Sequence, residues 1–130
     1  SPSRGLGDVY KRQILNSSRK VRVLINNEVL AETVRAKFLI ETNHPTRYYI
    51  PRDDVAIQLL PSSTITYCPY KGKARYYSIR VGDVMYKDIV WFYQDPVSES
   101  DKIKNYLCFY DEKVDEISVD YHSEIQYGPK

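Results

Sequence analysis

The fold is decided by the stretch TITYCPYKGKARYYSIRVGDVMYKDIVWFY, residues 64–93. Its β-branched and aromatic residues favour strands. The whole chain is rich in the aromatic residue tyrosine, of which it has 13. Two short segments, CPYKG at 68–72 and Gly82-Asp83, contain the proline and glycines typical of tight turns. The stretch therefore predicts antiparallel strands joined by hairpins, at residues 64–67, 74–81 and 84–93.

Further strands are predicted on both sides of this stretch, and one helix after it. Ser98 and Asp101 have the spacing of a capping box, and apolar residues at 103, 106 and 107 follow at helical spacing, which predicts a helix ending near Phe109. The remaining apolar segments predict strands at residues 21–25, 29–34, 38–40, 48–50 and 117–121. The sequence therefore predicts a mainly β, single-domain antiparallel sheet fold with one late helix.

Length and composition define the class of protein. A chain of 130 residues with 42% apolar residues is enough for one compact domain. It contains neither an apolar run of about 18 residues nor the apolar stretch of a secretory signal. Cys68 and Cys108 lie far apart without a C-x-x-C spacing. We therefore expect a cytoplasmic protein with reduced thiols.

The two ends of the chain are expected to lie outside this domain. Residues 1–13 show no periodicity, and the segment DVYKRQ at 8–13 back-translates to a transposase-adapter end used in DNA library preparation. The alternative is a natural disordered tail with a basic patch. In both cases we predict a tail at residues 1–13, a single domain at 14–125 and a C-terminal tail at 126–130.

The charge distribution argues against two classes of partner. The net charge is +2, and the predicted N-terminal tail accounts for all of it, so that the body is neutral. The nearest approach to a basic cluster is the row formed by Lys71, Lys73 and Arg75, and three charges give only weak, salt-sensitive binding to phosphates. We therefore expect no nucleic-acid or membrane partner, and a monomer or weak homodimer.

Common catalytic and metal-binding motifs are absent from the sequence. It contains no phosphate-binding glycine loop, no G-x-S-x-G and no H-E-x-x-H. Neither His44 nor His122 is followed by a second ligand three or four residues later. A zinc site would have to be assembled from Cys68, Cys108 and His44 across the fold. We therefore expect no metal and no cofactor.

A set of spaced motifs resembles a known family. They are Glu41-x-x-His44-Pro45, Tyr48-Tyr49-x-Pro51, the CPYKG segment with Ala74 and Tyr76 after it, and Trp91-x-Tyr93. Over about residues 20–121 the chain resembles the family catalogued as domain of unknown function 427, some members of which carry a nucleotidyltransferase label. The resemblance implies a small β fold of Mss4-like (β-tent) architecture. Zinc-binding relatives of that architecture use paired C-x-x-C knuckles, which this chain lacks.

The same residues suggest a polar site. Glu41 ends an apolar segment, and Cys68 and Lys71 flank a turn; strand ends and turns of small β folds often meet at a pocket. A neighbouring lysine lowers the pKa of a thiol, and Glu41 could orient the lysine or act as an acid or base. Alternatively, Cys68 is a packing residue and Glu41–Lys71 a structural ion pair. The predicted ligand-binding residues around this centre are His44, Tyr49, Tyr76, Trp91 and Tyr93.

These observations predict a protein that binds a small molecule around Glu41, Cys68 and Lys71. One version of this hypothesis is that the protein is an enzyme acting on that molecule. One alternative is a non-catalytic interaction module, in which these residues only hold the turns. Another is nucleotidyl transfer, as the family label suggests. That chemistry needs clustered carboxylates to hold Mg²⁺, and the adjacent pair Asp53-Asp54 is equally well explained by a turn.

Overall fold

The computed structural model describes residues 10–120, and its regular secondary structure is almost entirely β-strand. The described residues form ten strands and two short 3₁₀ helices. In chain order they are β1 (Arg12–Asn16), β2 (Val21–Ile25), β3 (Glu28–Thr33), β4 (Lys37–Glu41), β5 (Arg47–Ile50), η1 (Arg52–Asp54), β6 (Leu60–Cys68), β7 (Gly72–Val81), β8 (Val84–Tyr93), η2 (Ser98–Ile103), β9 (Leu107–Phe109) and β10 (Glu116–Val119). The prediction of a mainly β, antiparallel fold is confirmed.

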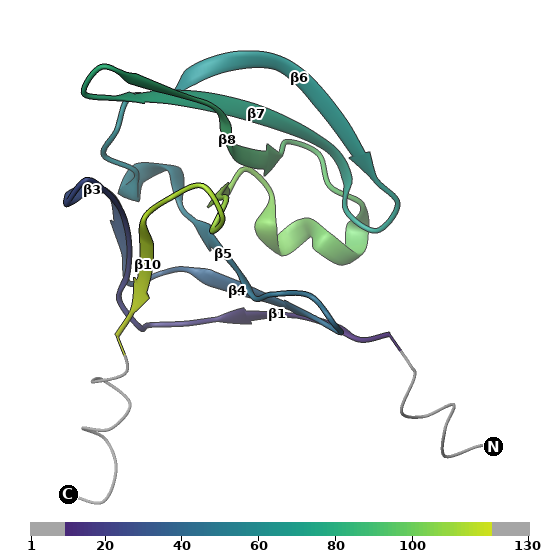
Figure 1. The fold of residues 1–130 in the computed structure, drawn as a ribbon. Helices are drawn as coiled ribbons and strands as arrows, with labels where there is room; N and C mark the ends of the chain where they lie inside the picture. The colour runs from purple at the N-terminus through teal and green to yellow at the C-terminus, as the bar shows by residue number, and fades with distance from the viewer. Residues whose placement is uncertain (1–9, 121–130) are drawn as a thin grey trace, which may run out of the picture.

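The strands form two antiparallel sheets. Seven of them make one sheet in the order β1-β4-β5-β9-β8-β7-β6, and the other three make a second sheet in the order β10-β2-β3. Figure 1 shows β6, β7 and β8 on one side of the molecule and β1, β4 and β5 on the other, with η2 between these two parts of the large sheet. The sheet bends between its two ends, so that residues distant in sequence face one another.

The hairpins predicted over residues 64–93 are present. Cys68 pairs with Gly72 at the β6–β7 turn, and Gly72 has a φ of +108°, a conformation that a side chain would strain. Val81 pairs with Val84 across the β7–β8 turn, where Gly82 has a φ of +59°. Glycine therefore avoids backbone strain at both turns, and most of all at Gly72.

The two faces of the large sheet bury different clusters. Along β8, Trp91 and Tyr93 point to one face, and Val90 and Phe92 point to the other, as the alternation of a strand requires. The Val90 and Phe92 face packs against β2 and β3 of the small sheet and forms the larger apolar core. The Trp91 and Tyr93 face carries a second cluster that is only partly covered. This second face holds the candidate site.

The predicted late helix is wrong. Ser98–Ile103 forms only a short 3₁₀ segment, in which Ser100 has a non-helical φ of −114°, and Ser98 makes no side-chain cap. The segment Leu107–Phe109, expected at the helix end, is strand β9. It lies between β5 and β8, where all three of its residues are buried. Pairing with two distant strands on both sides outweighs a weak local helical pattern.

The predicted tails lie mostly outside the described residues. Residues 12 and 13, the last two of the predicted N-terminal tail, belong to β1, where Gln13 pairs with Ile40 of β4. The predicted C-terminal tail, 126–130, and His122 lie outside the described residues. Within residues 10–120, no helix has the length and apolar character needed to cross a membrane.

Candidate functional site

A pocket of about 420 Å³ opens on the second face of the large sheet. Such a volume lies in the range of small-molecule sites. All eight residues that the sequence nominated line this pocket, although they come from β4, β5, β6, β7, β8 and two turns. They are Glu41, His44, Tyr49, Cys68, Lys71, Tyr76, Trp91 and Tyr93. The structure brings them together, and their roles stay a prediction.

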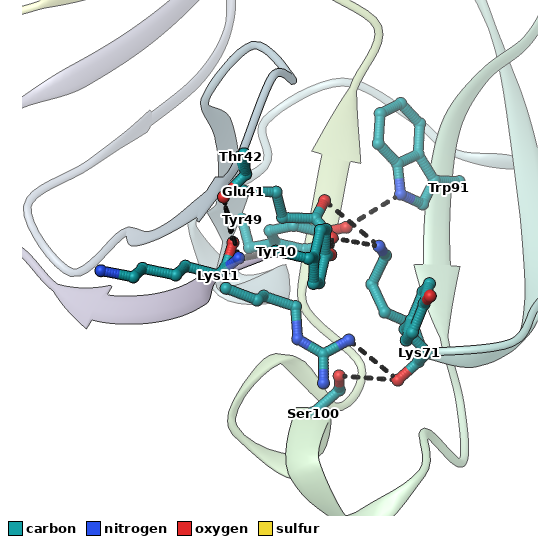
Figure 2. A network of polar contacts seen from close by, with 10 residues as sticks. Tyr10, Lys11, Glu41, Thr42, Tyr49, Lys71, Trp91 and Ser100 are labelled. Atoms are coloured by element: carbon teal, nitrogen blue, oxygen red, sulfur yellow. Dashed lines mark hydrogen bonds and ion pairs between the residues drawn. The ribbon is translucent and has the colours of Figure 1, made fainter. Parts of the chain in front are cut away.

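The ion pair between Glu41 and Lys71 lies in this pocket (Figure 2). Glu41 is the last residue of β4, and Lys71 belongs to the turn between β6 and β7. The Lys71 ammonium lies 3.4 Å from both carboxylate oxygens of Glu41, and the two side chains are only 12% and 11% exposed. The segment before η2 stabilises this turn, because the backbone N–H of Val97 donates a hydrogen bond to the Lys71 carbonyl at 3.1 Å. The pair is therefore both shielded from water and fixed in position.

The Glu41 carboxyl is ionised at neutral pH. Burial raises its pKa, but a hydrogen bond from the Tyr10 hydroxyl and the positive charge of Lys71 lower it by more, so that the net pKa lies below the ordinary value. In this state Glu41 accepts hydrogen bonds and attracts cations. It can therefore act as an acceptor or as a base, but not as a proton donor at pH 7.

Aromatic side chains form the pocket wall around Trp91. The indole N–H of Trp91 donates to the Tyr49 hydroxyl at 3.1 Å, and the two rings meet edge to face (Figure 2). Tyr110 lies against Trp91 with ring centroids 4.4 Å apart, and the Arg47 guanidinium lies 5.3 Å from the Trp91 ring. These contacts fix the indole in one orientation.

Two tyrosine hydroxyls differ in their availability to a ligand. The Tyr76 hydroxyl is hydrogen-bonded to Thr66 at 2.8 Å. The Tyr93 hydroxyl has no hydrogen-bond partner among residues 10–120, although its side chain lines the pocket. Burial raises the pKa of Tyr93 well above its ordinary value, so the phenol stays protonated. Tyr93 can therefore donate a hydrogen bond to a bound molecule.

The two cysteines are in different environments. Cys68, at the end of β6, is half-buried and lines the pocket. Cys108, in β9, is fully buried, and this burial raises the pKa of its thiol well above the ordinary value. In the part of the chain that the structure describes, no group of three histidine, cysteine or acidic side chains is arranged to hold a metal ion.

Four polar or aromatic lining residues were not predicted: Tyr10, Arg47, Tyr70 and Tyr110. Arg47 could have been found, because it lies two residues before Tyr49 on β5 and so shares its face. Its guanidinium is held by Glu112 through two bonds of 3.2 Å. Tyr10 stacks on Tyr70 with centroids 5.2 Å apart, a contact that no local pattern indicates.

Comparison with protein-family models gives a match over most of the chain. A family model named NTP_transf_9, with the description "Domain of unknown function (DUF427)", matches residues 13–120. No curated protein matches the chain.

Proposed function

The chain belongs to the family described as a domain of unknown function, DUF427, and from its pocket we propose that it binds a small planar molecule. The proposed site consists of Glu41, Lys71 and Cys68 as the polar centre and the aromatic residues around Trp91 as the walls. One observation carries the proposal: a shielded ion pair and a free phenol line the same aromatic pocket of about 420 Å³.

The chemistry of the lining suggests what the molecule contains. Aromatic walls favour a flat ring, which can stack on them. The Tyr93 hydroxyl is a donor for a carbonyl or similar acceptor on that ring. The Glu41–Lys71 pair presents an acceptor and a donor side by side, which suits a group that can both donate and accept, such as an amide.

The polar centre also supports a catalytic form of this proposal. Cys68 is the only cysteine among the lining residues, and Lys71 follows it within the same turn, where the Lys71 N–H donates to the Cys68 carbonyl at 3.3 Å. A nearby ammonium favours a thiolate, which is the nucleophilic form of cysteine. In this form, the Cys68 thiolate would add to an electrophilic double bond of the bound molecule. The C–S bond forms as the π bond breaks, the Lys71 ammonium supplies the proton, and Glu41 holds Lys71 in place.

The single tryptophan of the chain provides a direct test. Because Trp91 lines the pocket, its fluorescence should change when a ligand binds. We would titrate the protein with a panel of nucleobases, aromatic amides and aromatic carboxylates. A compound that binds should lose affinity in Lys71→Met and Tyr93→Phe, and keep it in Lys20→Met, which removes a lysine from an exposed ion pair instead. If affinity is the same in all four proteins, the compound binds elsewhere and the proposal fails for it.

The name of the matching family model motivates one alternative, nucleotidyl transfer. That reaction normally uses several carboxylates to hold Mg²⁺ against phosphates, and Glu41 is the one carboxylate that lines the pocket. The assay is pyrophosphate release from a nucleoside triphosphate with Mg²⁺. Release that Glu41→Gln abolishes and Glu32→Gln does not would favour this alternative.

A further inference from the structure

A second hollow lies on the opposite face of the large sheet. Its volume is about 650 Å³, and it is lined by the start of β7, the two residues that follow β8 and the segment after η2. Because Arg75 lies between Ala74 and Tyr76 on β7, its side chain points away from the face of the first pocket. The lining residues are Lys73, Arg75, Gln94, Asp95, Lys104 and Asn105.

The positive charges of this hollow outnumber its negative charges. Lys73, Arg75 and Lys104 form no ion pair with any residue between 10 and 120, and Asp95 is the single acid in the lining. The hollow therefore has a local net charge of +2, whereas the body of the protein is neutral. Like charges held close together repel one another, and a bound anion would relieve that repulsion.

The donors of the hollow suit one kind of anion. Two ammonium groups, a guanidinium and the side-chain amides of Gln94 and Asn105 together offer many N–H groups around the hollow. A phosphate group has several acceptor oxygens and up to two negative charges, and a guanidinium binds two of its oxygens at once. A phosphate therefore uses more of these donors than a carboxylate would.

An exposed aromatic ring lies beside the cations. Tyr67 of β6 pairs directly with Lys73 of β7, and Ile65 pairs with Arg75, so that all four side chains lie on the same face. Tyr67 is 76% exposed and Ile65 is 41% exposed. A flat ring attached to the phosphate could stack on Tyr67 while its phosphate lies in the hollow.

We propose that this hollow is a second binding site, which takes a small aromatic phosphate ester: Lys73, Arg75 and Lys104 bind the phosphate, and Tyr67 stacks on the ring. The site is distinct from the pocket around Trp91, since the two are lined by different residues on opposite faces of the sheet. It does not depend on the function proposed for that pocket.

The test uses phenyl phosphate, inorganic phosphate and phenol as probes, with binding followed by two-dimensional NMR of the full chain. Phenyl phosphate should bind more tightly than either of the other two. Arg75→Gln should weaken the binding of phenyl phosphate and of inorganic phosphate roughly fivefold. Tyr67→Ala should weaken the binding of phenyl phosphate by a similar factor and leave the binding of inorganic phosphate unchanged. All these side chains lie at the surface, so the variants should fold.

Two control variants locate the site. Arg80→Gln removes an exposed arginine from the same strand and should have no effect. Lys20→Met removes a lysine from an exposed ion pair outside both hollows and should also leave phenyl phosphate binding intact. Equal losses in Arg75→Gln and Arg80→Gln would show non-specific attraction and overturn the proposal, and so would a loss in Lys20→Met. Binding of a single-stranded oligonucleotide at least a hundredfold tighter than phenyl phosphate, and lost in Arg75→Gln, would replace it with a nucleic-acid surface.

Discussion

The Lys71 ammonium lies 3.4 Å from both carboxylate oxygens of Glu41, although the two residues are 30 positions apart in the chain. Both side chains are about nine-tenths buried. Exposed ion pairs contribute little to stability, but breaking a buried pair leaves a charge without a partner. The Glu41–Lys71 pair therefore links the end of β4 to the β6–β7 turn and defines the polar part of the pocket.

Replacing Glu41 should change how the stability of the protein depends on pH. The pKa of Glu41 is lower in the folded protein than its ordinary value of 4.5, so its stabilising effect is present above about pH 4.5 and is lost as the pH falls through the folded pKa. The free energy of unfolding of the wild type should exceed that of Glu41→Gln at pH 6, and the difference should shrink below pH 4.5.

Urea denaturation at pH values from 3 to 7 measures this difference. Glu32→Gln is the matched control, because Glu32 forms an exposed ion pair with Arg22 and should give a much smaller difference at pH 6. A difference between wild type and Glu41→Gln that does not vary with pH would show that the ionised form of Glu41 does not stabilise the fold.

The two thiols should react at very different rates. Cys108 is fully buried and its pKa is raised, so iodoacetamide at pH 8 should modify it only after unfolding, whereas Cys68 lines the pocket and should react in the native protein. Lys71→Met should slow the reaction of Cys68. Mass spectrometry of digested samples gives both rates. Equal, slow labelling of the two cysteines, with no response to Lys71→Met, would exclude Cys68 as a nucleophile.

Removing the Tyr49 hydroxyl should destabilise the protein. Tyr49→Phe leaves the buried indole N–H of Trp91 without its acceptor, which should lower the free energy of unfolding by roughly 1–3 kcal/mol. The control is Tyr67→Phe at a 76% exposed position, where a change below about 0.5 kcal/mol is expected. Chemical denaturation gives both values, and equal stability of the two variants would mean that the bond contributes nothing measurable.

Asp88 should be required where the pairing of β7 and β8 shifts register. It has a φ of +55°, and its carboxylate accepts a hydrogen bond of 2.7 Å from the Thr64 hydroxyl. Asp88→Ala should lower the free energy of unfolding by roughly 1–3 kcal/mol, since this φ is strained for alanine and alanine cannot accept the hydrogen bond from Thr64. Asp88→Asn should cost much less, because asparagine tolerates this conformation and keeps an acceptor. If Asp88→Ala and Asp88→Asn are equally stable in urea, neither the positive φ nor the hydrogen bond from Thr64 explains the role of Asp88.

Much of the site could be predicted because its residues lie beside strong local signals. Prolines and glycines end strands at recognisable points, and the side chains of Glu41, Cys68 and Lys71 lie at such ends. Alternation along a strand also links Trp91 with Tyr93. Arg47 follows from the same rule and was missed, whereas the contact of Tyr10 with Tyr70 has no local signal.

The sequence by itself determined most of the strands, the hairpin turns and the family, because turn residues and β-branched or aromatic runs act through interactions between neighbours in the chain. Tertiary structure alone decided that Leu107–Phe109 is a strand, since its hydrogen bonds go to β5 and β8. It also decided that Glu41 meets Lys71, and that Lys104 lies beside Lys73 and Arg75 around one hollow. The physical reason is that these contacts depend on how a seven-stranded sheet bends and orders its strands, and such non-local pairing leaves no pattern in any short segment.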